Sequence, residues 1–330
     1  MKLYYLGKPA DGFGWGVANT NLVRALNEFC DVEVETTNRT KFDAPVFVPV
    51  VDSALRPSRK VTAPRVVGYC FTEWPIEDDA HRTARKYDVL FAGSAWNTAR
   101  LHSAGVHHAL TLVQGVDLNR FKPSTPSERN GFVIFSGGKY EFRKGQDYVI
   151  AAMRHFMKWH GDVTLLTAWH NPWPQTMDSM KNSWLINHAN PFDGLPNDRI
   201  IHIPSVPNEA TPCIYQQAHV GLFPNRCEAG TNMVMTEFMA CGRPVIASHA
   251  TGHTDVLDES QYLLKAGSYD PAGWFNCNVS DILHHLEHAY THRQELVENG
   301  RKAAELTASL TWRGAALRVA QAAFPGHDFQ

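Results

Sequence analysis

Two glutamates, Glu228 and Glu237, have the surroundings most typical of a functional site in this chain. They lie in the stretch RCEAGTNMVMTEFMACGRPVIAS, where a short polar segment separates them and an apolar run encloses the second. Thr231 and Asn232 are good helix N-cap residues, and the Gly-Arg-Pro after Cys241 is a typical helix stop. The stretch therefore predicts a helix from Thr231 or Asn232 to Cys241, with one glutamate before the helix and the other in its second turn.

The chemistry expected here follows from the preceding segment. The apolar run VGLFPN predicts a buried parallel strand, so CEAGT would lie at the carboxyl edge of a sheet, where open α/β sheets bind ligands. Backbone N–H groups at a helix start suit a phosphate, which makes Gly230, Thr231 and Asn232 candidate binding residues. A phosphate site with a carboxylate on each side, where the carboxylates accept hydrogen bonds from ligand hydroxyls, fits a nucleotide sugar. Surface or capping glutamates are the alternative, although a charge among apolar neighbours, as at Glu237, is normally functional or paired.

A second stretch, SGGKYEFRKGQD, follows the strand expected for GFVIFSGG. It presents Gly138 and three cations, Lys139, Arg143 and Lys144, just before a predicted helix start. Fixed cations at a strand end would stabilise the charge that a leaving nucleoside diphosphate gains in the transition state. An exposed basic turn has the same composition, and both interpretations stay open.

Short apolar runs that alternate with helical segments predict parallel strands buried on both faces. The expected strands are MKLYYLG, DVEVE, APVFVPVV, RVVGYCF, VLFAGS and ALTLVQG, then GFVIFSGG, VTLLTAW, RIIHIPS and VGLFPN. The expected helices span residues 17–29, 78–87, 95–104, 146–160, 176–188 and 208–218. Because the polar segment KPSTPSERN at 122–130 predicts a linker, the expected fold class is α/β, with two Rossmann-like doubly wound domains at 1–125 and 130–310.

Composition excludes several classes of function. The 330 residues carry a net charge of -2 with a pI near 6.8, so no global basic field favours nucleic acid. The six cysteines form no CxxC pair, which favours reduced thiols in a cytosolic protein. No window reaches the ~20 apolar residues of a membrane span. We expect a cytoplasmic protein without nucleic-acid partners; peripheral membrane contact and the oligomeric state stay open.

Five segments together resemble the retaining glycosyltransferases of GT-B fold, in the large bacterial family with a Glu…Glu motif that includes family-4-like enzymes. They are FAGSAWNTARLHSAGV, VQGVDLNRFKP, GGKYEFRKGQD, CEAGTNMVMTEFMACGRPVIAS and SLTWRGAALRVAQAAF, which cover about residues 90–324. The resemblance implies two domains that face a cleft, with the acceptor on the first and the donor on the second. It also implies that the C-terminal helix, residues 311–324, packs back on the first domain.

The same resemblance implies roles for matched residues. Lys139 and Lys144 would contact the donor diphosphate, Glu237 the ribose hydroxyls, and Glu228 the donor hexose. Eight residues separate the glutamates where the family has seven, and Lys139 stands where the family has arginine. The implied reaction moves a hexose with retention from a UDP or GDP sugar to a glycan, lipid-linked or other hydroxyl acceptor. No further cofactor and no metal is expected.

The first domain offers two weaker candidates. The segment GFGWG, with Gly14, Trp15 and Gly16, loosely matches the family's glycine-rich loop; a plain tight turn is the alternative. Glu73 in CFTEWP resembles a glutamate of members with a short first domain and would line the cleft; a buried capping glutamate is the alternative.

Other function classes stay open at this point. A dinucleotide-dependent oxidoreductase would use GFGWGVAN, but Val17 stands where its fingerprint needs a third glycine. An epimerase, a hydrolase or an inactive scaffold on the same fold would share the donor contacts. His284, His288 and His292 recur every four residues, and an amphipathic surface helix explains them better than a metal site does.

Overall fold

The computed structural model describes residues 1–124, 131–187 and 190–329. Contacts divide the chain into two compact units. The first comprises Met1–Asp117, Ala229–Met233 and Leu310–Gln330, and the second comprises Leu118–Glu228 and Val234–Ser309. The chain thus passes from the first unit to the second at Asp117, before the expected linker. Residues 122–124 of that linker lie in the second unit, and residues 125–130 are outside the described residues.

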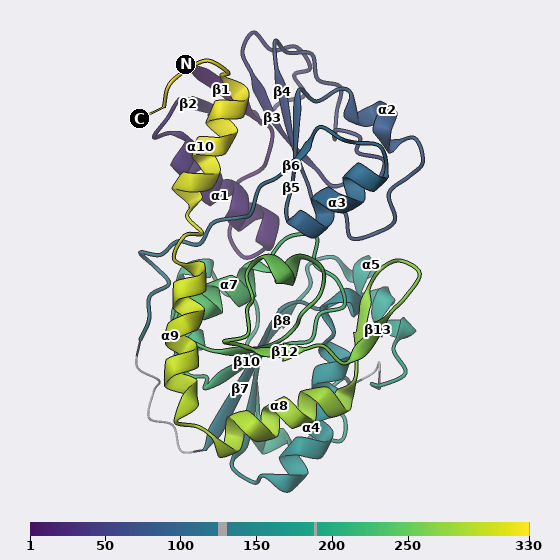
Figure 1. Ribbon diagram of the computed structural model, residues 1–330, viewed down its shortest axis with the longest axis vertical. Helices are drawn as coiled ribbons and strands as arrows, with labels where there is room; N and C mark the ends of the chain where they lie inside the picture. Colours follow the sequence, from purple (N-terminus) through teal and green to yellow (C-terminus); the bar gives the residue numbers. More distant parts are fainter. Residues whose placement is uncertain (125–130, 188–189, 330) are drawn as a thin grey trace. The chain divides into compact units, whose positions relative to one another are not determined.

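The first unit is built on a six-stranded parallel sheet of order β2-β1-β3-β4-β5-β6 (Figure 1). Its strands are β1 (Lys2–Tyr5), β2 (Asp31–Val34), β3 (Val46–Val50), β4 (Val66–Cys70), β5 (Val89–Ala92) and β6 (Ala109–Thr111). Its helices are α1 (Gly14–Leu26), α2 (Ala80–Ala84), α3 (Ala95–Ser103) and α10 (Trp312–Ala323). The buried valines and aromatics of the central strands account for the continuous apolar runs in the sequence.

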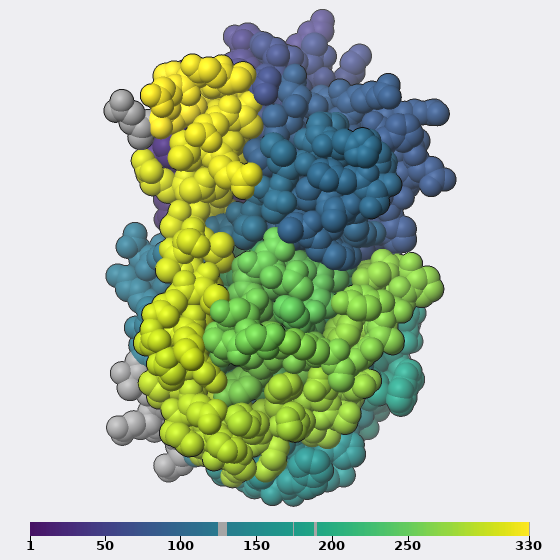
Figure 2. Space-filling model, in the orientation of Figure 1, coloured from purple at the N-terminus to yellow at the C-terminus, as the bar shows by residue number. Residues whose placement is uncertain are grey.

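Helix α10 brings the end of the chain back to the first unit. It packs against α1 beside the sheet, and its Trp312, Val319 and Ala320 are buried in the same core as Leu3. Figure 2 shows the surface of these last residues, in yellow, against the purple and blue surface of the first unit. The apolar spacing within SLTWRGAALRVAQAAF is therefore that of a helix with one buried face.

The second unit repeats the architecture, with a parallel sheet of order β12-β11-β10-β7-β8-β9. Its strands are β7 (Phe132–Lys139), β8 (Val163–His170), β9 (Ile200–His202), β10 (Val220–Phe223), β11 (Val245–Ser248) and β12 (Tyr262–Leu264), with an antiparallel hairpin of β13 (Gly267–Tyr269) and β14 (Phe275–Cys277). Its helices are α4 (Gln146–Trp159), α5 (Pro174–Met177), α6 (Thr211–Tyr215), α7 (Met233–Ala240), α8 (Val279–Thr291) and α9 (Glu295–Thr307). The prediction of two doubly wound parallel sheets is confirmed.

Three predicted helices are wrong in extent. The segment 78–87 forms only α2 (Ala80–Ala84), and the other two are broken into short turns. The segment 176–188 forms only α5 and the 3-10 turn η2 (Asp178–Asn182), because the hydroxyl of Ser183 turns inward and donates to Asp147 at 2.6 Å; residue 188 lies outside the described residues. The segment 208–218 forms the 3-10 turn η4 (Asn208–Ala210) and the short helix α6, in whose first turn Pro212 lies.

The start of α1 also differs from the sequence prediction. The helix begins at Gly14 rather than near residue 17, so three of the five residues of GFGWG, Gly14 to Gly16, lie in its first turn. Gly16 has to be glycine because a Cβ there would lie 2.7 Å from the Cβ of Ala10. The glycine therefore permits close packing of the preceding loop on the helix.

Candidate functional site

The candidate site of the second unit is formed by the loops that follow β7 and β10. The first loop carries the 3-10 turn η1 (Phe142–Lys144) and then Gly145, whose φ of 71° is left-handed. A Cβ on Gly145 would lie 2.1 Å from the carbonyl oxygen of Pro224, so only glycine permits this approach. The carbonyl oxygen of Arg143 accepts hydrogen bonds from the backbone N–H groups of Arg226 at 2.8 Å and Cys227 at 3.2 Å. The two loops are therefore one hydrogen-bonded structure.

Arg226 and Asp147 form an ion pair that joins these loops. The guanidinium donates to both carboxylate oxygens of Asp147, at 2.8 and 2.7 Å, and both side chains are buried. The rings of Phe142 and Tyr148 lie 3.7 and 4.0 Å from the guanidinium carbon. The sequence analysis missed this pair, although the Asp of KGQD and the Arg before CE were both within the quoted motifs.

Glu228 lies among the predicted cations. Its carboxylate pairs with Lys144 Nζ at 2.6 Å and with Arg143 Nη1 at 3.1 Å, and Asn225 Nδ2 also donates to it. The backbone N–H of Glu228 donates to Thr251 Oγ1 at 3.0 Å. Burial alone would raise the pKa of Glu228, but the charges of Lys144 and Arg143 outweigh it and hold the pKa at about 2. Glu228 is therefore ionised at neutral pH.

A second carboxylate extends the cluster toward solvent. Glu141 lies 2.8 Å from Lys139 Nζ and 2.7 Å from Arg143 Nε. Lys139 is the most accessible of the cluster's cations, with 29% of its side chain exposed against 11% for Lys144. Its ammonium also lies 5.2 Å from the centre of the Trp173 ring. Three cations face two carboxylates here, which leaves one net positive charge at the carboxyl edge of the sheet.

His253 is a further buried group in this environment, and it is one that the sequence analysis did not identify. Its Nδ1 lies 3.1 Å from the carbonyl oxygen of Ser248 at the end of β11, so Nδ1 carries the proton. Burial lowers the pKa of His253 to about 4, against the opposing influence of Glu228. The imidazole is therefore neutral at physiological pH.

Glu237 belongs to a separate network, within α7. Asn208 Nδ2 donates to its Oε1 at 3.0 Å, and the Tyr215 hydroxyl donates to its Oε2 at 3.2 Å. Arg120 in turn donates to Asn208 Oδ1 at 2.7 Å. The predicted position of Glu237 in the second turn of a helix is confirmed by α7. Asn208 lies in η4 and Tyr215 in α6, and no motif in the sequence pointed to them.

The segment between the two glutamates is arranged differently from the prediction. The carbonyl oxygen of Ala229 accepts a hydrogen bond from Ser94 at 2.8 Å, and Gly230 lies so close to Phe71 that a Cβ would approach its ring to 2.6 Å. Asn232 has a left-handed φ of 61°, whereas a helix N-cap is normally extended. The buried Thr231 hydroxyl finds no hydrogen-bond partner among the described residues. Helix α7 begins at Met233, after the predicted start at Thr231 or Asn232, and the side chain of Thr231 does not cap it.

The candidates of the first unit lie near the carboxyl ends of β1 and β4. Trp15, in the first turn of α1, contacts the ring of Phe71 edge-on, with the ring centres 5.0 Å apart. Glu73 lies two residues beyond Phe71 and lines a hollow with it. No Cβ contact constrains Gly14. Trp15 therefore contacts the Phe71 ring, and Phe71 and Glu73 line the same hollow.

Within residues 1–124, 131–187 and 190–329, no three His, Cys, Asp or Glu side chains are grouped as metal ligands. Among the helices in that part of the chain, none is both long and apolar enough to cross a membrane. All six cysteines are free thiols.

Sequence comparison finds a family model that matches part of the second unit. Residues 131–278 match the family model described as "Glycosyl transferases group 1". The chain is similar to the D-inositol 3-phosphate glycosyltransferase of Xylanimonas cellulosilytica, with 27% identity over 235 residues that cover 66% of this chain and 50% of that protein. The chain thus spans about half the length of the curated relatives it matches.

Structural comparison extends the likeness to nearly the whole chain. Sucrose-phosphate synthase from Thermosynechococcus elongatus superposes with a TM-score of 0.72 at 15% identity, over 97% of this chain and 98% of that one. HepE from Anabaena, solved with UDP and glucose, superposes with a TM-score of 0.71 at 15% identity, over the same shares of each chain. Residues 131–278, which hold the networks of Glu228 and Glu237, therefore match the group 1 glycosyl transferase family, and the chain has the GT-B fold.

Proposed function

We propose that this chain transfers a hexose from a nucleoside-diphosphate sugar to a hydroxyl of a carbohydrate or lipid-linked acceptor, with retention of the anomeric configuration. The observation that carries the proposal is the cluster of Glu228, Lys144 and Arg143 at the carboxyl edge of β7 and β10. The cluster lies within the region that matches the transferase family. In this assignment the second unit binds the donor and the first unit binds the acceptor.

The charges of the cluster suit the leaving group. In the reaction, the bond from the sugar C1 to the diphosphate oxygen breaks, a bond from C1 to the acceptor oxygen forms, and one proton is released. The diphosphate gains negative charge as its bond breaks. Lys139, Arg143 and Lys144 are held in place by Glu141 and Glu228, so they meet that charge without reorganisation.

Two further buried groups, Glu237 and Thr231, suit the rest of the donor. Glu237 has the acceptor oxygens that ribose hydroxyls need, and Asn208 and Tyr215 hold its carboxylate in one orientation. The unpartnered Thr231 hydroxyl is a ready hydrogen-bonding group at the start of α7. Because lysines and an arginine supply the positive charge, the proposed reaction needs no metal and no further cofactor. A UDP or GDP sugar is the proposed donor; HepE was solved with UDP.

Two measurements test the proposal. Thermal unfolding with UDP, GDP, ADP, CMP and NAD in parallel should show one nucleoside diphosphate that raises the Tm, since a ligand at 100 times its Kd adds ~2.7 kcal/mol to the folded state. Release of that diphosphate from its sugar nucleotide should then depend on an added acceptor. A shift with NAD alone would support an oxidoreductase instead, and release that ignores the acceptor would indicate a hydrolase.

A further inference from the structure

The first unit contains a hollow of about 330 Å³ at the carboxyl ends of β3 and β4. Its lining includes three carboxylates, Asp52, Glu73 and Glu77, and the large side chain of Trp74. Trp74 is 57% exposed, so it presents a flat apolar surface to solvent. The lining therefore combines hydrogen-bond acceptors with one flat apolar face.

The wall that carries Glu73 and Trp74 is fixed by α3. Arg100 donates to the carbonyl oxygens of Thr72 at 2.6 Å and Trp74 at 2.9 Å. Asn97 is also hydrogen-bonded to Thr72, through the backbone N–H of Thr72 at 3.4 Å and through its hydroxyl. Because several hydrogen bonds hold the backbone of this loop, the positions from which its side chains extend are fixed before any ligand binds.

The charge of the hollow is negative. Its lining holds three carboxylates and no lysine or arginine. Arg56, outside the lining, already pairs with Glu77 at 3.2 Å and with Asp52 at 3.7 Å. The guanidinium of Arg100 is directed at backbone carbonyls of the wall. A phosphate placed here would meet like charges, which disfavours it.

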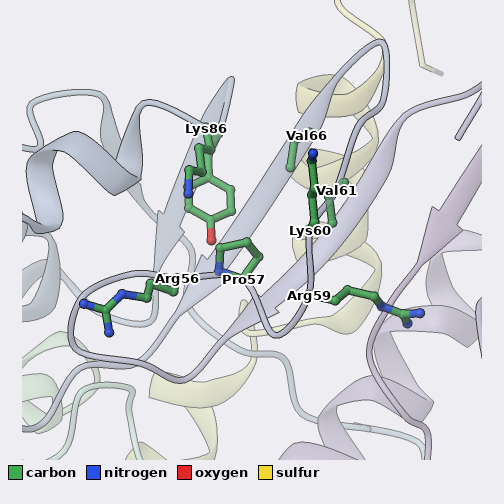
Figure 3. A pocket seen from close by; sticks show the side chains of 8 residues that line it. Arg56, Pro57, Arg59, Lys60, Val61, Val66 and Lys86 are labelled. Carbon is green, nitrogen blue, oxygen red and sulfur yellow. The ribbon is translucent and has the colours of Figure 1, made fainter. Parts of the chain in front are cut away.

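Four cationic side chains of the first unit line a different hollow. Figure 3 shows a second hollow, of about 510 Å³, with Arg56 and Arg59 directed to opposite sides and Lys60 and Lys86 also on its lining. It includes Val66, the first residue of β4, and therefore lies at the amino end of that strand. The lining of the acidic hollow, at the carboxyl end of β4, holds no lysine or arginine, and Arg56 of the second hollow reaches it through the ion pairs with Glu77 and Asp52.

We infer that the acidic hollow is an acceptor subsite for a sugar ring that carries no phosphate and no carboxylate. The C–H face of the ring would lie on Trp74, which removes apolar surface from water. The ring hydroxyls would donate to Asp52, Glu73 and Glu77, and charge-assisted hydrogen bonds of this kind are strong. This inference rests on the proposed transferase function, for which it names the class of acceptor.

Direct binding tests the inference without turnover. Saturation-transfer NMR on the full chain would compare methyl α-D-glucoside with its 6-phosphate, and myo-inositol with inositol 3-phosphate. We expect the uncharged member of at least one pair to bind about tenfold more tightly than its phosphate, a difference typical of electrostatic exclusion. Trp74→Ala should abolish this binding. Trp159→Ala is the matched control, because Trp159 is 60% exposed on α4 of the second unit.

A second variant reports on the carboxylates. Glu73→Gln should reduce the difference in affinity between the uncharged and the phosphorylated ligands, because it removes one negative charge that repels the phosphate. Tighter binding of the phosphates, unchanged sugar binding in Trp74→Ala, or no binding of any uncharged sugar would each overturn the inference. The change in Tm with nucleotides tests the proposed function separately from the sugar subsite. If Trp74→Ala abolishes sugar binding but no nucleotide raises the Tm, the result would support the subsite and contradict the transferase.

Discussion

Arg226 and Asp147 form a buried, bidentate ion pair that fastens the loop after β10 to the start of α4, with both N–O distances below 3 Å. The same guanidinium donates to the carbonyl oxygen of Phe142 at 2.7 Å and to Asn276 Oδ1 at 3.1 Å. Arg226 therefore positions the cations of η1 relative to Glu228, which lies two residues further along the chain. It is a positioning residue, since it acts through the loops that it holds.

Removal of Arg226 should cost more stability than removal of any surface arginine. Arg226→Met leaves Asp147 as an uncompensated buried charge, which typically costs about 3–5 kcal/mol and should lower the Tm by roughly 10 °C, at ~2–4 °C per kcal/mol. Arg301→Met is the control, because Arg301 is 55% exposed and pairs with Glu298 at 2.7 Å; exposed pairs contribute about 0–1 kcal/mol. Equal losses in the two variants, measured by calorimetry, would contradict a special role for the buried pair.

The diphosphate cations should affect turnover. Lys139→Ala and Lys144→Ala should each lower kcat by about 10²–10³, the scale for one preorganised electrostatic stabiliser. Lys139→Ala should leave the Tm nearly unchanged, because its side chain is 29% exposed. Lys144→Ala should also lower the Tm, because it removes the 2.6 Å partner of the buried Glu228.

Lys158→Ala provides the control for these two variants, since Lys158 is exposed on α4. Steady-state kinetics with saturating donor and acceptor give the comparison. Near-normal kcat in both cluster variants would show that the cationic turn has no part in the reaction.

Glu237 should affect the KM for the donor and not the KM for the acceptor. Glu237→Gln keeps the shape of the side chain, and one amide oxygen still accepts from Asn208 or Tyr215. The variant replaces charge-assisted hydrogen bonds to the ribose hydroxyls, worth ~1.5–3 kcal/mol, with weaker neutral ones, so the donor KM should rise by about tenfold. An increase confined to the acceptor KM would place Glu237 on the other substrate.

Stability should fall as the pH decreases below neutral, through two groups in succession. The folded pKa of His253 is about 4, below its ordinary 6.5, so the unfolded chain binds more protons and stability is lost as the pH falls from about 6.5 to 4. The folded pKa of Glu228 is about 2, below its ordinary 4.5, so its contribution is lost as the pH falls from about 4.5 to 2.

Urea unfolding at a series of pH values measures these contributions. His253→Asn, whose amide can replace the hydrogen bond to Ser248, should flatten the profile between pH 6.5 and 4, where one such group adds a slope of up to ~1.4 kcal/mol per pH unit. His292→Asn is the control, because that imidazole is exposed at the end of α8. An unaltered slope in His253→Asn would show that another group is responsible.

The sequence identified the fold and the groups that follow strand ends, because both leave local signals. Parallel strands appear as apolar runs, and Lys144 and Glu228 follow the ends of β7 and β10, which pair in the sheet. The partners of Glu237 were missed because Asn208 and Tyr215 come from short turns with no periodic pattern. The Thr231 cap was wrong, and the residues just before it, Ala229 and Gly230, contact Ser94 and Phe71, which lie more than a hundred residues earlier and leave no local signal.

Activity should persist without divalent metal. The cluster already supplies three cations near the proposed diphosphate site, and Glu228 and Glu141 are occupied by ion pairs with them, so no carboxylate of the cluster is left to bind Mg²⁺ in the usual way. Turnover in excess EDTA should therefore equal turnover in Mg²⁺ within about twofold, a difference of ~0.4 kcal/mol in activation free energy. The same assay with Lys144→Ala gives a sharper test, because a metal that replaced the missing charge would rescue this variant only. Loss of wild-type activity in EDTA, restored by Mg²⁺ or Mn²⁺, would show that a metal rather than the lysines neutralises the leaving diphosphate.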